Sequence, residues 1–532
     1  MGASAEIEFL IVLLGVVALL ALLARAVRVP YPIFLVLGGL AIGFVPGIPE
    51  ISLPPEVIFL VFLPPLLNSA AFSSSPLDLR AHLRPILLLA VGLVLLTIAA
   101  VATLGHFVMG MPWAVAFVLG AVVAPTDPVA AEAIFRRLGV PDRVSTVIGG
   151  ESLINDGSAL VAFRIAVAAV GPGVFVAWQA GLSFLVVGGG GILLGLVLAR
   201  IFTPLWGRIT DSSILIVVSL VMPYATYVLA EELHVSGILA VVAFGLYQGW
   251  HSPTLFPGAS ARLQAIGFWG VLTFMLDSLL FILVGLQFPA IFVDGAREQT
   301  TGELLFYAAL VCGVIIVTRM AWFFTIPYAH PIINRVVRIN YLRAPWRERV
   351  VMGWSGLRGA VSLAAALAIP LTVPGGGDFP QRDLIIFLAF CTILATLVLQ
   401  GLTLPPLIRT LNLKADENAL TLSELRARVR ASQAALARLK EFQEDGRYPE
   451  NNHEQMWEYY ENRIERYEAG LEAGGTTDEY ASTSASWRGW RRELLSAERE
   501  ELLSLRNMGE ISPEVMRRIE RDLDLEESRI GG

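Results

Sequence analysis

The chain has 532 residues, of which 55% are hydrophobic, and its mean hydropathy is +0.65. Its 39 basic and 46 acidic residues give a net charge of −7, which excludes the basic excess that nucleic-acid binding needs. The last 120 residues hold 18 of the basic and 26 of the acidic residues. This composition predicts a polytopic membrane domain over 1–412 and a charged, mostly helical C-terminal domain over 413–532.

Thirteen apolar segments are long enough to span a hydrocarbon core of about 30 Å. They cover residues 6–26, 31–46, 55–72, 85–106, 112–135, 145–170, 174–201, 212–230, 235–250, 265–292, 303–328, 350–371 and 383–408. Arginines concentrate in alternate connections, which carry Arg25, Arg28, Arg80, Arg84, Arg136, Arg137, Arg143, Arg200, Arg208, Arg262, Arg335, Arg338, Arg343, Arg347 and Arg349. The intervening connections carry only Arg297 and Arg382. The positive-inside rule therefore predicts an outer N-terminus and a cytoplasmic C-terminal domain.

Two of these segments, seven apart in order, are interrupted by helix breakers. The fifth contains Ala-Pro-Thr-Asp-Pro at 124–128, and the twelfth contains Gly-Trp-Ser-Gly-Leu-Arg-Gly at 353–359. Proline removes a backbone donor, and glycine lets the chain unwind. An odd offset inverts the second copy in the membrane, and paired interrupted helices in inverted halves mark the midplane site of a transporter. Simple proline kinks are the alternative, but a kink does not require Asp127.

The sixth segment carries Gly-Glu-Ser-Leu-Ile-Asn-Asp-Gly at 150–157. On a helix, Glu151 with Asn155 and Ser152 with Asp156 form i,i+4 pairs, so the polar residues make two adjacent stripes. A charge at the bilayer centre costs at least about 3 kcal/mol, and such residues by default mark an ion or substrate path. Arg164, two turns beyond Asp156, is interpreted as a snorkelling or pairing residue near the outer surface.

The runs at 125–130, 150–157 and 356–363 resemble the signatures of monovalent cation:proton antiporters of the NhaP and animal sodium/hydrogen exchanger type, as do 63–67 and 234–240. The resemblance covers the membrane domain and not the tail. It implies an all-α, NhaA-like fold with about thirteen transmembrane helices in two inverted repeats and two crossing interrupted helices. It also implies a homodimer in the plasma membrane that is not an enzyme, and that has no cofactor besides the transported Na+ and H+.

The resemblance assigns the site residue by residue. Asp156 would be the main ion- and proton-carrying carboxylate, and Asp127, the Thr126 carbonyl and Ser152 would complete the Na+ site. Asn155 belongs to the same set, but its amide cannot titrate. Electrogenic relatives carry two adjacent aspartates here, so this chain is expected to exchange one H+ for one Na+ (or Li+) by alternating access.

Three further residues have supporting roles by the same resemblance. Glu151 would form a buried structural pair with Arg319, and Arg358 would offset the helix-end charges where the two interrupted helices cross. Two positions depart from the family pattern. Ser69 stands where many relatives have an acid, which leaves cation preference open. Asp277 stands where relatives tend to have asparagine, and it would be a neutral buried acid, a partner for a base, or part of the ion path.

Other functions remain alternatives at this point. A potassium/proton or mixed sodium/potassium antiporter fits the same motifs, because selectivity depends on cavity size and ligand number. A passive channel is disfavoured by the inverted, interrupted helices. An intramembrane aspartyl protease using Asp127 and Asp156 would need a Gly-x-Gly-Asp context, which neither residue has. The expected partners are membrane lipid, a second copy of the chain, and a regulator that binds the tail.

Overall fold

The computed structural model describes most of the chain. The described residues are 3–27, 29–46, 54–170, 177–255, 259–295, 300–325, 344–373, 376–444, 450–472, 478–508, 515–516, 519–520, 522–524 and 526–527. Five arginines of the orientation argument, Arg28, Arg297, Arg335, Arg338 and Arg343, lie outside them. Within the described residues the regular secondary structure is helical, and one isolated bridge joins Thr372 and Asp378. The predicted all-α class is therefore confirmed.

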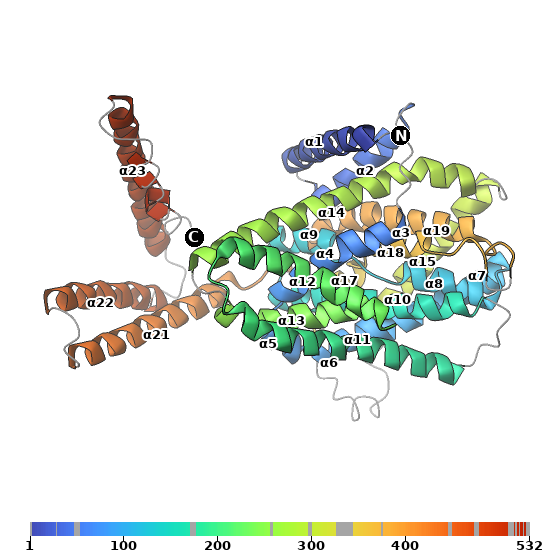
Figure 1. Ribbon diagram of the computed structural model, residues 1–532, viewed down its shortest axis with the longest axis horizontal. Helices are drawn as coiled ribbons and strands as arrows, with labels where there is room; N and C mark the ends of the chain where they lie inside the picture. Colours follow the sequence, from blue (N-terminus) through green and yellow to red (C-terminus); the bar gives the residue numbers. More distant parts are fainter. Residues whose placement is uncertain are drawn as a thin grey trace. The chain divides into compact units, whose positions relative to one another are not determined.

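Every predicted span coincides with a helix or with an interrupted pair of helices (Figure 1). The first half contains α1 (Ala3–Val27), α2 (Tyr31–Gly43), α3 (Pro55–Val57), α4 (Leu63–Ser73), α5 (Pro76–Ala81), α6 (Leu83–Leu87), α7 (Val94–Met109), α8 (Trp113–Val123), α9 (Val129–Leu138), α10 (Asp142–Ala168) and α11 (Ala177–Trp206). The second half contains α12 (Ser212–Glu232), α13 (Gly237–Leu255), α14 (Ala259–Gly295), α15 (Thr301–Thr325), α17 (Trp346–Trp354), α18 (Ala360–Leu367), α19 (Arg382–Ala395) and α20 (Gly401–Thr410). Short π-helical stretches join α3 to α4, α6 to α7 and α19 to α20.

Seven helices of the described chain are long and apolar enough to cross a membrane. They are Pro55–Ser73, Leu83–Met109, Trp178–Trp206, Ser212–Glu232, Ser260–Pro289, Thr301–Thr325 and Arg382–Thr410. Shorter apolar helices cover Ile11–Val27, Tyr31–Gly43 and Trp113–Val123. The polar residues of α10 keep it out of this apolar set despite its 27 residues. The total of thirteen spans and their inverted repeat stay predictions.

Both predicted interruptions are present. The fifth span breaks between Val123 and Val129, and the twelfth breaks between Trp354 and Ala360. The second break begins two residues later than its glycine-rich sequence suggests, because Gly353 and Trp354 still belong to α17. Glycine permits unwinding without forcing it, whereas Pro125 and Pro128 lack the donors that a continuous helix needs.

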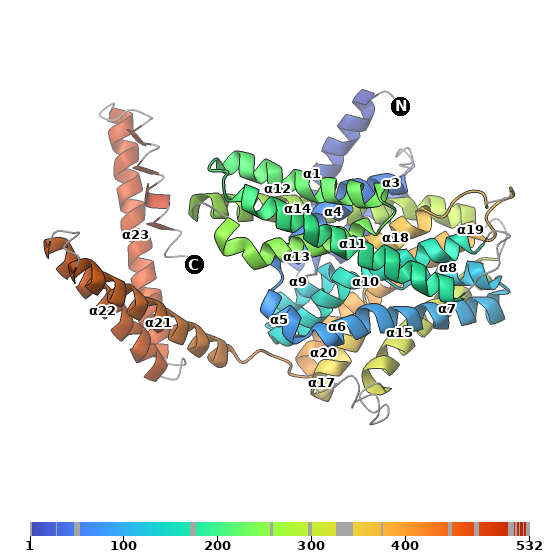
Figure 2. The same cartoon turned by 60° about the horizontal axis from the view of Figure 1, so that its bottom comes forward.

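Glycines allow neighbouring helices around the site to approach each other closely. A Cβ on Gly39 would lie 2.2 Å from the carbonyl oxygen of Ile282, so α2 touches the backbone of α14. A Cβ on Gly195 would lie 2.1 Å from Ala240 O, which joins α11 and α13 equally closely. Figure 2 shows α12 and α14 toward the upper edge of residues 1–414, α13 below them, and α15, α17 and α20 toward the lower edge.

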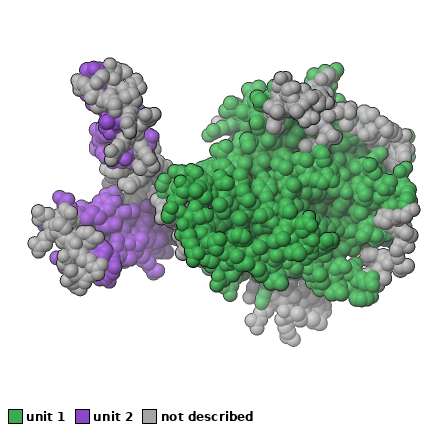
Figure 3. Space-filling view, in the orientation of Figure 1, with its two compact units in different colours: residues 1–414 green, residues 415–532 purple. Residues whose placement is uncertain are grey.

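The chain divides into two compact units, residues 1–414 and 415–532, which Figure 3 draws in green and purple. The second unit contains α21 (Glu417–Glu444), α22 (Glu450–Glu472) and α23 (Asp478–Met508). Leu425 and Val429, four residues apart on α21, are buried. Across the α21–α22 pair, the Arg428 guanidinium lies 5.7 Å from the ring centre of Tyr467.

Candidate ion-binding site

The two interrupted segments meet at the centre of the first unit. The backbone N–H of Asp127 donates to the carbonyl oxygen of Leu357 at 2.8 Å, which joins the unwound stretch 124–128 to the unwound stretch 355–359. Unwinding frees these main-chain groups from their own helices, so they can bond to each other. The crossing leaves four helix ends inside the unit. Negative side chains are favourable at the N-terminal ends, and positive side chains are favourable at the C-terminal ends.

The two carboxylate oxygens of Asp127 make different contacts. Its Oδ1 accepts a hydrogen bond at 2.9 Å from the N–H of Val129, the first residue of α9, and so satisfies one of the free donors at that helix end. Its Oδ2 faces the other interrupted segment, where a Cβ added to Gly359 would lie only 1.8 Å away. The absence of a side chain at Gly359 is therefore what allows the carboxylate to enter the crossing.

Gly359→Ala is expected to displace Asp127 and to lower exchange at least about tenfold. Overpacking of this kind also destabilises a protein, typically by about 1–3 kcal/mol. Cation-dependent proton flux in proteoliposomes, together with the melting temperature, measures both effects. Gly313→Ala is the matched control, because a Cβ on that α15 glycine meets nothing within 4 Å. Equal loss in both variants would contradict the steric explanation.

Thr126 is the centre of the hydrogen-bond network between the first interruption and α10. Its carbonyl oxygen accepts from Ser152 Oγ at 2.8 Å, and its Oγ1 accepts from Asn155 Nδ2 at 2.6 Å. The same hydroxyl donates to Glu151 Oε1 at 3.3 Å. The i,i+4 stripes of α10 thus face the unwound stretch. A carbonyl oxygen has two lone pairs, so the Thr126 carbonyl retains one for a further ligand.

Asp156 differs from its neighbours because its side chain makes no hydrogen bond to any residue that the structure describes. Its side chain is buried, with 6% of the residue exposed, and it interacts electrostatically with Asp127. An unpartnered buried carboxylate is costly unless it binds a proton or a cation. In the described part of the chain, no three His, Cys, Asp or Glu side chains gather into a metal-holding group. The oxygen donors available here therefore combine two carboxylates with a carbonyl and a hydroxyl.

Glu151 and Arg319 form a bidentate ion pair between α10 and α15. Arg319 Nη1 donates to Glu151 Oε1 at 2.5 Å, and Nη2 donates to Oε2 at 2.8 Å. The two residues are 1% and 3% exposed, and Arg319 Nε also donates to the carbonyl oxygen of Met352 at 3.2 Å. This is the contact that the family resemblance implied, and it binds α10, α15 and α17 together.

Arg358 lies at the crossing without an acidic partner among the described residues. Its Nε donates to the carbonyl oxygen of Val123 at 2.8 Å, and its Nη1 donates to Gly356 O at 2.8 Å. Val123 is the last residue of α8, so the guanidinium meets the partial negative charge of that helix end. Its backbone N–H donates to Thr396 Oγ1 at 3.0 Å. The geometry matches the expected compensation of helix-end charge.

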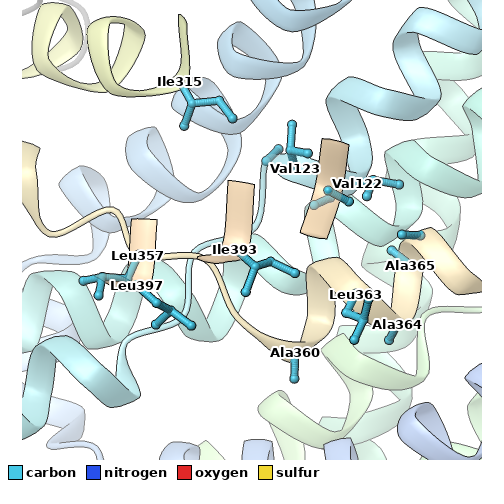
Figure 4. Close-up of a cluster of buried hydrophobic side chains, with 14 of the residues drawn as sticks. Val122, Val123, Ile315, Leu357, Ala360, Leu363, Ala364, Ala365, Ile393 and Leu397 are labelled. Carbon is cyan, nitrogen blue, oxygen red and sulfur yellow. The ribbon is translucent and has the colours of Figure 1, made fainter. Parts of the chain in front are cut away.

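Apolar side chains enclose this polar crossing. Figure 4 shows Val122 and Val123 of α8, Leu363 of α18, and Ile393 and Leu397 gathered around the unwound backbone. All five are buried. A dry, low-dielectric wall strengthens the interactions of the buried charges with each other and raises the penalty for leaving one unpaired.

The structure brings most of the predicted residues together and leaves two apart from the hydrogen-bond network. Ser69 on α4 is partly exposed and makes no hydrogen bond within the described chain. Asp277 on α14 is partly buried, likewise has no hydrogen bond or ion pair there, and interacts electrostatically with Asp127. Thr396, which holds the backbone of Arg358, was not anticipated, because a single threonine in an apolar span carries no sequence signal.

Comparison with known proteins decides the family. The family model for "Sodium/hydrogen exchanger, transmembrane" matches residues 12–410. The chain belongs to the sodium/hydrogen exchanger family. The resemblance drawn from the motifs is thereby confirmed, and this exchanger is a multi-pass membrane transporter of an antiporter family rather than an enzyme.

Relatives and a solved structure agree with this assignment. The exchanger is 35% identical to an uncharacterized Na+/H+ exchanger of Mycobacterium tuberculosis, over 97% of this chain and 96% of the relative. It is 35% identical to a sodium, potassium, lithium and rubidium/H+ antiporter of Bacillus pumilus, over 74% of this chain and 61% of that protein. The sodium proton antiporter MjNhaP1 of Methanocaldococcus jannaschii matches with a TM-score of 0.62 at 21% identity, over 77% of this chain and 99% of the other. The fold is therefore that of an NhaP antiporter.

Proposed function

We propose that this exchanger moves Na+ against H+ by alternating access, with Asp156 as the carrier that binds either ion. The observation that carries the proposal is the Asp156 carboxylate beside the crossing, which has no hydrogen-bond partner in the described part of the chain, whereas its neighbours Glu151, Ser152 and Asn155 all have partners. In transporters of this kind, unwound backbone carbonyls and half-helix ends coordinate the cation at the midplane.

Four groups form the proposed Na+ site: the carboxylates of Asp156 and Asp127, the Thr126 carbonyl and the Ser152 hydroxyl. They come from α10 and from the unwound stretch before α9, so movement of one element against the other changes the coordination. Because Na+ and H+ share Asp156, they compete, and a higher proton concentration raises the apparent KM for the cation.

A potassium/proton or mixed-ion antiporter is the second candidate. Ser69 supplies no third carboxylate, and the Bacillus pumilus relative is named for sodium, potassium, lithium and rubidium. Antiport measured in proteoliposomes with Na+, Li+ and K+ between about pH 6 and 9 decides between the candidates, since ion binding and carboxylate protonation compete over that range. Proton flux that does not depend on any of the three cations would overturn both proposals.

We expect one-for-one exchange, because the amide of Asn155 cannot take a proton and Glu151 is held by Arg319. With Asp156 as the only carrier, no net charge crosses the membrane. A membrane potential, which provides about 2.3 kcal/mol per charge per 100 mV, would then neither drive nor slow exchange. Proteoliposomes clamped with potassium and valinomycin at zero and at about −100 mV should give equal rates and the same reversal point.

A reversal point that moves with voltage would show a second titrating group. Asp277→Asn is the first variant to test in that case, because this partly buried acid interacts electrostatically with Asp127. Restoration of voltage independence in Asp277→Asn would assign the second proton to Asp277. An unchanged voltage dependence would leave Asp127 as the second carrier.

The remaining expectations concern topology and assembly. Arginine placement supports an outer N-terminus and a cytoplasmic domain over 413–532, and the plasma membrane is the location we propose. A homodimer and a regulator-binding tail complete the proposal. Native mass measurement in lipid tests the dimer directly, and a monomer throughout would contradict it.

A further inference from the structure

A second ion pair joins the site helix to a different group of helices. Arg164 on α10 donates to both carboxylate oxygens of Glu231 on α12, at 2.8 and 2.7 Å. The side chains are 48% and 31% exposed, so solvent reaches the pair. Arg164 follows Asp156 by eight residues, which places it about 12 Å further along α10 toward the predicted outer end.

Glu231 is a fixed part of the corner between α12 and α13. Its Oε1 also accepts from the N–H of Gly237, the first residue of α13, at 3.2 Å. A Cβ at Gly237 would lie 2.7 Å from the Tyr227 ring and 2.9 Å from that same oxygen, so the corner is closely packed. His234, with φ of 58°, makes the tight turn between the two helices. The carboxylate therefore moves with α12 and α13.

Beneath the ion pair, α10 packs directly against α13. A Cβ added to Gly157, the residue after Asp156, would lie 2.5 Å from Leu239 Cδ2. Leu239 is 7% exposed. At the same corner, Ser236 donates its N–H to Val187 O of α11. The helices α11, α12 and α13 also contact one another, so they form one packed group. On this side of the site, Leu239 and the ion pair stand one above the other.

We propose that the Arg164–Glu231 pair is an outer latch, which holds α10 against α11–α13 and keeps the predicted outer route to Asp156 closed. The inference rests on the alternating access proposed above. Opening toward the outside requires α10 and Leu239 to part, and the ion pair must break before they do. An exposed ion pair stabilises the outward-closed state only modestly, and raises its population relative to the outward-open state by up to about fivefold. Such a latch biases the two states without locking either.

Sided measurements test the latch. Glu231→Gln is expected to lower the apparent KM for Na+ at the outer face, and to raise it at the inner face, by about two- to fivefold. A loss of stability alone would not move the two constants in opposite directions. Right-side-out and everted membrane vesicles provide the two faces. Glu303→Gln is the matched control, because Glu303 also lies at the predicted outer side and, among the described residues, its carboxylate bonds only to Thr300 beside it.

Accessibility provides an independent readout. A Leu239→Cys reporter in a Cys312→Ala/Cys391→Ala background should react about two- to fivefold faster with an impermeant maleimide when Glu231→Gln is added. The charge swap Arg164→Glu/Glu231→Arg should restore the slow rate. Unchanged labelling and unchanged sided KM values in Glu231→Gln, in vesicles where the unmodified chain exchanges ions, would overturn the latch. Faster labelling in a chain that exchanges no ions would instead overturn the proposed function and leave the latch standing.

Discussion

Asp156→Asn is expected to abolish cation/proton exchange and leave the protein folded. The substitution keeps the size of the side chain and removes the group that binds both ions. The Asp156 carboxylate makes no hydrogen bond to the described residues, so its replacement breaks no such bond. Since an isolated buried carboxylate is unfavourable, the neutral amide should maintain or raise the melting temperature. Proton flux driven by a sodium gradient in proteoliposomes measures the loss.

Asp142→Asn on the same helix is the control for this experiment. Asp142 lies in the first turn of α10, about 21 Å from Asp156 along the helix axis, and should leave exchange unchanged. Residual transport in Asp156→Asn that still depends on proton concentration would assign the carrier role elsewhere, with Asp127 first. Full transport by this variant would remove the centre of the proposed mechanism.

Local chemistry explains why the interruptions could be predicted. Pro125 and Pro128 lack the N–H groups that a continuous helix uses, so a break at 124–128 follows from residue type alone. The boundary of the second break was less certain, because Gly353 permits a helix as well as a bend. There the structure keeps α17 intact to Trp354 and unwinds the chain from Ser355.

The face of α10 that carries the site could also be predicted from the spacing of its polar residues. The polar residues of α10 lie on two adjacent stripes. Three of them, Glu151, Ser152 and Asn155, bond to a single residue of the unwound stretch. What spacing could not provide was the identity of that residue, since Thr126 is 25 to 29 positions away in sequence. The resemblance supplied Thr126 as a carbonyl ligand, but not its hydroxyl as a donor to Glu151.

Contacts between distant helices mark the limit of sequence reasoning here. Arg164 was expected to snorkel or to find a partner, and its partner Glu231 lies 67 positions further on. Glu231 shares the predicted outer side with Arg164, which was the available signal. Glu232 beside it fits that signal equally well, and only the packing of α12 against α13 distinguishes the two glutamates.

The Glu151–Arg319 pair is expected to be the largest single electrostatic contribution to stability in the membrane unit. Both side chains are almost fully buried, and the two hydrogen bonds are in the bidentate geometry that arginine favours. Glu151→Gln would leave a buried guanidinium without its counter-charge. Loss of one partner from such a pair typically costs about 3–5 kcal/mol. Arg319→Ala would leave an uncompensated carboxylate beside Thr126 and should cost a similar amount.

Thermal unfolding in detergent and purified yield measure these effects. Ser152→Ala loses one hydrogen bond to Thr126 O and is expected to cost only about 1 kcal/mol. Glu132→Gln is a second comparison, because the Glu132–Arg136 pair lies within one helix, with Arg136 82% exposed. Such an i,i+4 pair contributes about 0.2–0.5 kcal/mol. A melting temperature of Glu151→Gln no lower than these two would rule out the structural role.

The double variant Glu151→Gln/Arg319→Ala separates the pair from its surroundings. Once both charges are gone, neither leaves an unpaired buried partner, so the double change should cost less than the sum of the single changes. The carbonyl of Met352 loses the Arg319 Nε donor both in Arg319→Ala and in the double variant, so this loss cancels in the cycle. A coupling of several kcal/mol would place the pair among the contacts that keep α10 in register with α15. Strict additivity would show that the two charges stabilise the fold independently, and would make Glu151 a candidate ion ligand beside Asp156.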